Sequence, residues 1–269
     1  MDFLLSAAKM VLALAVGLPL VAYLLQDRLL FYPQPLGEPE RAEVRKRHPA
    51  VKEVFLEAGS QRLHAWHVDA GAGAPLVLYF GGNAEDVSWF IADAEQTASG
   101  VSWLLVNYRG YGASGGSPSA ATITADALKW HDYAVKELKP RQVFAFGRSL
   151  GSAAAVHVAA SRPLAGVILV TPFDSLSAVA KRHYWFLPID LLLKQRLDSV
   201  ELAPGITAPL LCIAAAEDRL VPPEHARRLY EAWAGPRQWV LISGAGHNGT
   251  DGDPAFRRSV RGFLALPGM

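Results

Sequence analysis

The stretch Phe146–Gly151 reads FGRSLG and places a serine between two glycines in the G-x-S-x-G spacing. A serine hydroxyl becomes a nucleophile when a sharp turn exposes it and a nearby base accepts its proton. An apolar run over residues 142–146 precedes the motif and an alanine-rich run over 150–160 follows it, which is typical of a strand, a tight turn and a helix. The flanking glycines leave room for backbone that passes close to the turn. We therefore predict that Ser149 is a catalytic nucleophile.

A nucleophilic serine requires a histidine that accepts its proton and a carboxylate that orients the histidine. The apolar run 210–216 leads into Asp218, and the apolar run 239–242 leads into His247 on a glycine-flanked loop. The order serine, acid, histidine along the chain is the one that accompanies this serine motif. We predict that Ser149, Asp218 and His247 form a triad for acyl transfer.

Two residues compete for the roles of acid and base. Glu217 adjoins Asp218, but the two side chains should point in different directions, and we favour Asp218 as the acid. His225 also follows Asp218 along the chain, but it lies in a helical pattern and is expected at the protein surface. His247 is therefore the predicted base.

These residues need a framework that brings distant parts of the chain together. Apolar runs predict eight strands, at residues 51–56, 63–68, 75–80, 101–106, 143–146, 166–170, 210–214 and 239–242. Helical patterns lie at residues 84–97, 120–138, 150–160, 223–234 and 254–266. The first two strands alternate in polarity and are expected to pair antiparallel, whereas several later runs suit strands that are buried on both faces. We predict an α/β fold with an eight-stranded, mostly parallel sheet and a ligand site at the carboxyl ends of the strands.

A glycine-containing turn, Gly81-Gly82-Asn83, follows the third predicted strand and opens a helical pattern. Enzymes with a nucleophile elbow supply one backbone N–H for the oxyanion at this place, and the second N–H belongs to the residue after the nucleophile. We therefore predict the N–H groups of Asn83 and Leu150 as the oxyanion hole. The glycine-rich segment 107–116 lacks the lysine of a phosphate-binding loop and is predicted to be structural.

The N-terminal residues 3–25 are almost wholly apolar. A helix of this length reaches roughly 34 Å, which is enough to cross a bilayer core of about 30 Å. We predict a single-pass transmembrane helix over residues 1–25, which anchors the protein in a membrane. A cleaved signal peptide is the alternative, because residues 13–15 read Ala-Leu-Ala.

Residues 26–50 contain several prolines, among them Pro33, Pro35 and Pro39, and a run of mixed charges, and they are expected to be a juxtamembrane linker. Residues 51–269 are then the catalytic domain. Basic residues lie on both sides of the predicted anchor, so the membrane face of the catalytic domain stays open.

The chain resembles the α/β-hydrolase superfamily, and in particular its membrane-anchored α/β-hydrolase-domain proteins. The resemblance covers nearly the whole chain and rests on the following segments: Asp27–Pro33, Gly82–Ala84, Asn107–Gly116, Phe146–Gly151, Asp218–Pro222 and Gly244–His247. Gly81 departs from the pattern, because many relatives carry histidine there, and this puts the first oxyanion donor in doubt. The resemblance implies hydrolysis of an ester, a thioester or a lipid without a metal or a cofactor, and it leaves the substrate open.

Members of this superfamily insert a cap between two late strands, and residues 174–204 occupy that place. The segment is short and apolar, and four of its residues are predicted to bind an acyl chain: Trp185, Phe186, Leu187 and Ile189. The alternative is that these side chains only pack the cap onto the sheet.

Composition excludes several other functions. The chain has 269 residues and a net charge of +1, which gives no electrostatic basis for binding nucleic acid. A single cysteine, Cys212, excludes an internal disulfide, and no cysteine–histidine cluster has the spacing of a zinc site. We predict a membrane-anchored serine hydrolase that cleaves lipid or acyl esters or thioesters. The alternatives are a peptidase or amidase with the same triad and a catalytically silent scaffold, and the sequence leaves the oligomeric state open.

Overall fold

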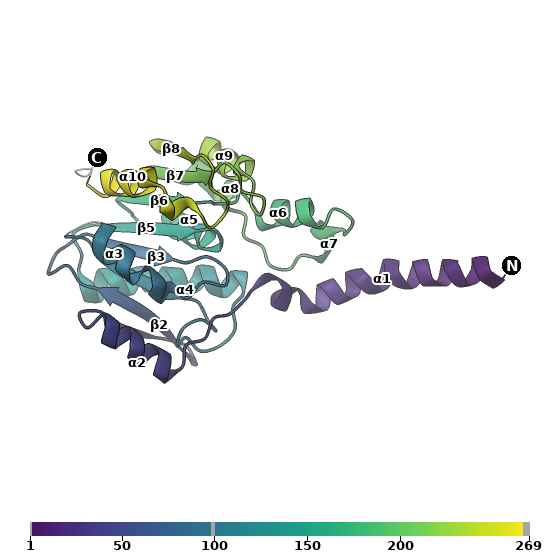
Figure 1. Cartoon of the computed structure of the whole chain (residues 1–269), viewed down its shortest axis with the longest axis horizontal. Helices are drawn as coiled ribbons and strands as arrows, with labels where there is room; N and C mark the ends of the chain where they lie inside the picture. Colours follow the sequence, from purple (N-terminus) through teal and green to yellow (C-terminus); the bar gives the residue numbers. More distant parts are fainter. Residues whose placement is uncertain (1, 98–99, 266–269) are drawn as a thin grey trace.

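The computed structural model of the protein describes residues 2–97 and 100–265. One eight-stranded sheet has the strand order β1-β2-β4-β3-β5-β6-β7-β8 (Figure 1). Its strands are β1 (Lys52–Ala58), β2 (Gln61–Val68), β3 (Leu76–Phe80), β4 (Ser102–Asn107), β5 (Val143–Arg148), β6 (Gly166–Val170), β7 (Leu210–Ala215) and β8 (Arg237–Ile242). The β1–β2 and β2–β4 pairs are antiparallel and the other pairs are parallel, which confirms the predicted mostly parallel sheet.

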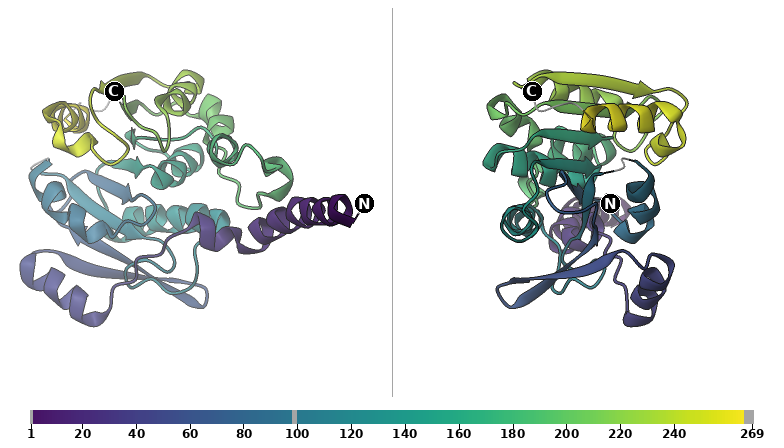
Figure 2. Two further views of the ribbon diagram at one scale, coloured as in Figure 1. Left: turned by 45° about the vertical axis from the view of Figure 1, so that its right-hand side comes forward. Right: turned by 90° about the vertical axis from the view of Figure 1, so that its left-hand side faces the viewer.

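Helices cover both faces of this sheet (Figure 2). The main ones are α3 (Ile91–Thr97) and α10 (Pro254–Leu264) on one face, and α4 (Ala120–Tyr133), α5 (Leu150–Ser161) and α9 (Pro223–Ala232) on the other. Alternate residues of β3 serve the two faces: Leu78 packs in the core with α4 and α5, whereas Tyr79 packs with α3 and α10. The strands β3 to β7 are buried along their whole length, as expected of strands that are covered on both faces, whereas β1 and β8 at the sheet edges are partly exposed.

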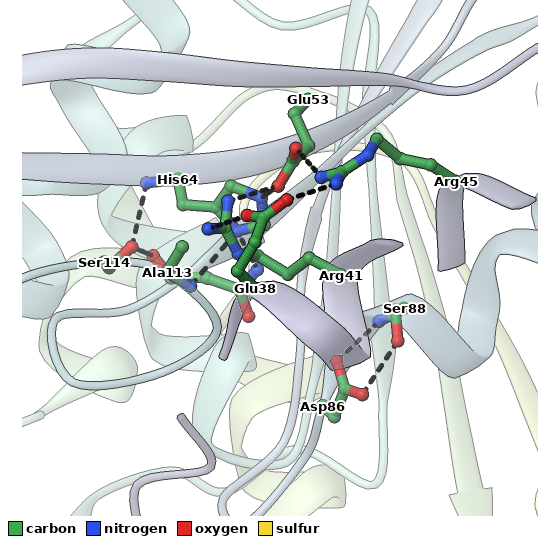
Figure 3. Close-up of polar contacts among 10 residues, drawn as sticks. Glu38, Arg41, Arg45, Glu53, His64, Asp86, Ser88, Ala113 and Ser114 are labelled. Carbon is green, nitrogen blue, oxygen red and sulfur yellow. Dashed lines mark hydrogen bonds and ion pairs between the residues drawn. The ribbon is translucent and has the colours of Figure 1, made fainter. Parts of the chain in front are cut away.

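Two predicted helices differ from the pattern that the sequence suggested. The pattern 84–97 forms a short 3₁₀ turn, η1 (Val87–Phe90), followed by α3. Asp86 caps this turn by accepting hydrogen bonds from the N–H and the hydroxyl of Ser88 (Figure 3). The pattern 120–138 ends in a single π turn, η2 (Ala134–Leu138), after α4. The delayed start of α3 leaves residues 81–86 as a turn at the carboxyl end of β3.

The N-terminal residues form one long helix, α1 (Asp2–Leu30), which extends away from the sheet (Figure 1). The helix is five residues longer at its carboxyl end than the predicted segment 1–25. Over residues 2–97 and 100–265, no helix combines the length and the apolar character needed to cross a membrane, so the predicted transmembrane helix is not found.

Residues 26–50, predicted to be a linker, pack against the rest of the protein. Phe31 is buried in the core. Gly112 donates its N–H to the carbonyl of Gln34, and the N–H of Leu36 donates to the carbonyl of Gly112, each at 2.8 Å. The helix α2 (Glu38–Arg47) follows. This segment is therefore part of the folded domain.

The cap lies between β6 and β7 and contains three short helices, α6 (Leu176–His183), α7 (Ile189–Leu192) and α8 (Ser199–Leu202), followed by the 3₁₀ turn η3 (Ala203–Gly205). The carboxyl half of α1 docks on it. The buried side chain of Gln26 donates to the carbonyl of Leu192 at 3.1 Å and accepts from the N–H of Lys194 at 2.7 Å. These two bonds hold α1 against the cap together with a third, which the side chain of Gln195 donates to the carboxylate of Asp27 at 2.7 Å.

Candidate active site

Ser149 lies on a tight turn between β5 and α5. Its backbone has φ 47° and ψ −113°, a region that residues with a side chain rarely adopt. A methyl group on Gly147 would lie 2.4 Å from the carbonyl oxygen of Gly151, and one on Gly151 would lie 2.0 Å from the carbonyl oxygen of Phe80. Both glycines are therefore required by close backbone contacts, and the turn projects Ser149 from the carboxyl end of β5.

Three residues from three strand ends meet at this turn. The Nε2 atom of His247 lies 2.8 Å from the Oγ atom of Ser149, and its Nδ1 atom lies 2.6 Å from the Oδ2 atom of Asp218. With Nδ1–H donating to the carboxylate, Nε2 is free to accept the serine proton. The structure thus brings together the serine, the histidine and the aspartate that the sequence singled out.

The loop after β7 decides between the two candidate acids. Asp218 is buried, and its Oδ1 atom accepts the N–H groups of Leu220 at 2.9 Å and Val221 at 2.8 Å. Glu217 is exposed to solvent. Two backbone bonds therefore orient the Asp218 carboxylate, whose other oxygen faces His247.

His225, predicted to be exposed on a helix, is buried instead. Its Nδ1 atom lies 2.6 Å from the Oδ1 atom of Asp174, and the Nε atom of Arg228 donates to the other carboxylate oxygen at 2.5 Å. Burial raises the pKa of Asp174, but these partners outweigh it and hold that pKa below its usual value. His225 faces the cap because it lies in the first turn of α9, where the helix meets the segment after β6.

The turn at the carboxyl end of β3 carries the predicted oxyanion donor Asn83. The N–H of Gly82 donates to the Glu85 carboxylate at 2.6 Å, and the hydroxyl of Tyr108 donates to the carbonyl of Gly81 at 2.7 Å. In the described part of the chain, no hydrogen bond engages the N–H of Asn83. Leu150 is the first residue of α5, where a backbone N–H has no partner within the helix.

A pocket of about 400 Å³ opens in front of Ser149. It is lined by Gly82, Asn83, Ala84, Glu85, Asp86, Trp89, Arg148, Ser149, Leu220, His247, Asn248 and Asp251. Arg148 is buried and pairs with Asp251. The lining therefore combines Ser149 and His247 with a polar wall.

The four predicted acyl-binding residues lie elsewhere on the cap. Trp185 is 82% exposed and Phe186 is 58% exposed. Leu187 and Ile189 line a separate apolar cavity of about 150 Å³, which they share with Leu29 and other residues of α1. None of the four is among the residues that line the pocket at Ser149.

Comparison with known proteins identifies relatives over most of the chain. A sequence profile described as serine aminopeptidase, S33, matches residues 74–197. An uncharacterised protein of Mycobacterium tuberculosis is 36% identical over 91% of this chain and 88% of its own length. An uncharacterised membrane protein of Saccharomyces cerevisiae is 30% identical over 82% of this chain and 81% of its own length. An esterase of Pyrococcus furiosus has the same fold, with a TM-score of 0.67 and 18% identity over 87% of this chain and 96% of the esterase.

The chain belongs to the α/β-hydrolase family. The resemblance inferred from the sequence motifs is thereby confirmed. The likeness to the esterase extends over the sheet and its helices, and at 18% identity it concerns the fold.

Several residues around the site of this hydrolase were not singled out in the sequence. Glu85 is one, because its carboxylate fixes the oxyanion turn and also accepts the hydroxyl of Tyr79 at 2.6 Å. Arg148, inside the serine motif, is a second. Tyr111 is a third, since its hydroxyl donates to the side chain of Asn83 at 2.9 Å. All three lie in or next to motifs that the sequence analysis quoted, but their roles depend on contacts with distant residues that the motifs do not specify.

A polar network centred on His64 of β2 contacts the glycine-rich segment 107–116 (Figure 3). The buried ring of His64 lies with Nδ1 2.9 Å from the side-chain nitrogen of Asn107 and with Nε2 3.3 Å from the Glu53 carboxylate. The N–H of His64 donates to the hydroxyl of Ser114 at 2.8 Å. Ion pairs then join β1 to α2 in a cluster of alternating charge: Glu38, Arg41, Arg45 and Glu53.

Burial lowers the pKa of His64 to about 4, against the opposing charge of Glu53. His64 is therefore neutral at physiological pH and joins Asn107 to Glu53 without a positive charge of its own. Burial would raise the pKa of Glu53, but Arg41 and Arg45 hold it below its usual value. The network thus keeps a charged carboxylate beside a neutral imidazole.

Proposed function

We propose that this protein is a serine hydrolase that cleaves carboxylic ester or thioester bonds of lipid or acyl substrates. The observation that carries the proposal is the pair of contacts at His247, 2.8 Å to the Ser149 hydroxyl and 2.6 Å to the Asp218 carboxylate, at a serine held in a strained turn. A buried serine without such partners would be a poor nucleophile.

The reaction follows from the role of each group. His247 accepts the hydroxyl proton as the Ser149 Oγ atom attacks the carbonyl carbon, and the negative charge on the carbonyl oxygen is held by the N–H groups of Asn83 and Leu150. Collapse of the intermediate breaks the bond to the alcohol or thiol, which leaves with the proton from His247. Water then attacks the acyl-serine by the same route, which releases the acid and regenerates Ser149.

We infer a substrate with a polar end, which occupies the pocket, and an apolar end, which meets the cap outside the pocket. The pocket at Ser149 carries polar side chains such as Asn248 and Asp251, which suit a hydroxylated leaving group. The cap offers the apolar side chains Trp185, Phe186, Leu187 and Ile189, and we propose that these contact the acyl chain or the lipid around it. The structural neighbour from Pyrococcus furiosus is an esterase, which agrees with an ester substrate.

The protein is proposed to work at a membrane, to which α1 attaches it. The outer part of this helix exposes large apolar side chains, among them Phe3, Leu4 and Met10, and such surfaces mark contacts with a partner or a lipid. The yeast relative is described as a membrane protein. Replacing these three residues by glutamine should abolish co-sedimentation with phospholipid vesicles while leaving hydrolysis of a soluble ester unchanged. Equal co-sedimentation of the variant would contradict a role of α1 in attachment.

The test of the enzymatic proposal is hydrolysis of p-nitrophenyl butyrate by the full chain and by Ser149→Ala. The wild-type protein should turn the ester over and should be labelled by a fluorophosphonate, whereas Ser149→Ala should do neither and should keep its melting temperature. Turnover by Ser149→Ala in a clean preparation would exclude Ser149 as the nucleophile.

A peptidase or amidase with the same triad is the second candidate, because the matching family profile is described as a serine aminopeptidase. Matched ester and p-nitroanilide substrates with the same acyl group separate the two. Hydrolysis of the anilide at a rate comparable to the ester would favour the second candidate. Absence of turnover and of labelling on both would favour a silent scaffold.

A further inference from the structure

The side chain of Asn83 makes four hydrogen bonds at the edge of the catalytic pocket. Its Nδ2 atom donates to the carbonyl of Leu30 at 2.6 Å. Its Oδ1 atom accepts the N–H of Tyr32 at 3.0 Å, the hydroxyl of Tyr111 at 2.9 Å and the N–H of Ala84 at 3.2 Å. Three of these partners are 28 to 53 residues away in the sequence, so this amide joins the oxyanion turn to two distant segments.

The turn that Asn83 holds is strained. Ala84 has φ 57°, a left-handed conformation that is unfavourable for a residue with a side chain. Such a conformation persists when surrounding contacts over-determine it. The hydrogen bonds of the Asn83 amide constrain the residue before Ala84. The residue after it, Glu85, is constrained because its carboxylate accepts the N–H of Gly82. The direction of the Asn83 N–H therefore depends on these side-chain bonds.

The hydroxyl of Tyr111 is protonated and donates its hydrogen bond to the side chain of Asn83. Tyr111 is almost fully buried, and burial raises the pKa of its phenol to about 12, so the hydroxyl keeps its proton at physiological pH. Its ring packs edge-on against Tyr108, with centroids 5.5 Å apart, and Tyr108 in turn donates to Gly81. The two tyrosines thus fix both ends of the oxyanion turn from segment 107–116.

The other partners of Asn83 belong to the end of α1. Leu30 is the last residue of that helix, and Phe31, buried in the core, fixes the chain between Leu30 and Tyr32. Gln26 lies one helical turn earlier and holds α1 on the cap through Leu192 and Lys194. The position of the Leu30 carbonyl is therefore linked to the way in which α1 packs on the cap.

We propose that the side-chain amide of Asn83 is a positioning group for the oxyanion hole, and that it ties the donor N–H to the end of α1, so that the seating of α1 determines the rate of acyl transfer. This inference rests on the proposed hydrolase function. It adds to the mechanism a dependence of kcat on a helix that contributes none of the triad residues.

The experiment compares three variants on p-nitrophenyl butyrate in the full chain. Asn83→Ala should lower kcat by roughly 10–100-fold with little change in KM, because loss of a whole oxyanion donor costs about 10²–10³-fold and here the donor is only misaligned. Tyr111→Phe removes one bond and should lower kcat by a smaller factor. Gln34→Ala is the matched control, since it truncates an amide of the same segment whose contact is a 3.4 Å bond to the Tyr32 carbonyl, and it should leave kcat unchanged.

Two further readouts separate a positioning role from a structural one. Binding of a phenylboronic acid, which forms a tetrahedral adduct with the serine, should weaken in proportion to the loss in kcat for Asn83→Ala, while the pH dependence of the residual activity stays as in the wild type. Loss of kcat with unchanged boronate binding would overturn the proposal. If Asn83→Ala fails to fold, the kcat values of Tyr111→Phe and Gln26→Ala test the positioning role instead.

The link to α1 is tested with Gln26→Ala, which removes its two side-chain bonds to the cap. It should lower kcat, and its effect should be non-additive with that of Asn83→Ala, because both act on the same turn. Full additivity, or an unchanged kcat in Gln26→Ala, would exclude α1 as a determinant of the rate. Absence of ester turnover by the wild-type protein would instead refute the proposed function, so the two failures are distinguishable.

Discussion

The two halves of the catalytic pocket are held in place by different means. On one side, the elbow around Ser149 is fixed by backbone: Gly147 and Gly151 allow contacts that no other residue permits, and the N–H of Ser149 donates to the Val170 carbonyl at 2.9 Å in the neighbouring strand. On the other side, the turn is fixed by the side chain of Asn83, which bonds backbone groups at the end of α1 and the hydroxyl of Tyr111 in segment 107–116.

This difference separates what is rigid from what is adjustable. Backbone contacts within the sheet fix the conformation of the elbow, and backbone N–H groups likewise hold Asp218, the proposed acid. The oxyanion turn depends on individual side-chain bonds, each worth about 0.5–1.5 kcal/mol net. Changes on the elbow side should therefore abolish activity or folding, whereas changes on the other side should adjust the rate or the stability by smaller steps.

The largest effect is expected for Asp218→Asn. An asparagine at this place stabilises the wrong histidine tautomer and gives no charge to balance the imidazolium, so kcat should fall by about 10⁴-fold, or about 5.5 kcal/mol. Glu217→Gln, next to it and exposed, should leave kcat unchanged. Steady-state kinetics on p-nitrophenyl butyrate measures both. An equal loss in the two variants would mean that Glu217 shares the role of acid.

A smaller but severe effect is expected for Gly151→Ala. The added methyl group would lie 2.0 Å from the Phe80 carbonyl oxygen, so β3 and α5 must separate, and the protein should lose about 3–4 kcal/mol of stability or fail to fold. The matched control is Gly262→Ala in α10, where a methyl group meets open space and should stabilise by about 0.5–1 kcal/mol. Urea unfolding of both variants measures the contrast, and equal stabilities would refute the requirement for glycine at the elbow.

The smallest effect concerns the network behind segment 107–116. The pKa of folded His64, about 4, lies below its unfolded value of about 6.5, so the unfolded state binds more protons between these values. The part of the free energy of unfolding that depends on neutral His64 is complete above pH 6.5 and is lost as the pH falls toward 4. The loss amounts to about 2 kcal/mol at pH 5. His64→Gln should remove this part of the pH dependence, and urea midpoints at pH 7 and pH 5 measure it. An unchanged pH dependence in the variant would contradict the assignment.

The same contrast explains which features the sequence predicted. Ser149 and His247 follow strands on glycine-marked loops, and the strands themselves are local apolar runs, so pattern and spacing sufficed. The partners of Asn83 are far from it in the sequence, so the motif segments Asp27–Pro33 and Asn107–Gly116 were recognised, but their contacts with Asn83 were not. His225 was assigned to the surface because a helical pattern does not reveal which face meets the cap.

The N-terminal segment shows the same limit. Prolines and mixed charges between residues 26 and 50 suggested a linker, because such composition is common in solvated chains. The burial of Phe31 and the pairing of residues 34–36 with Gly112 depend on a segment about 80 residues later. Composition describes a segment alone, whereas these contacts depend on the completed fold.

The docking of α1 on the cap imposes an order on biosynthesis. Gln26 and Leu192, which hold the two together, are 166 residues apart. At a translation rate of about 5–20 residues per second, roughly 8–33 s pass between their synthesis. Throughout that interval the apolar helix exists without its cap, and chaperones or a bilayer can capture it before the hydrolase is complete. The contacts that seat α1 on the cap therefore form only after most of the chain has been synthesised.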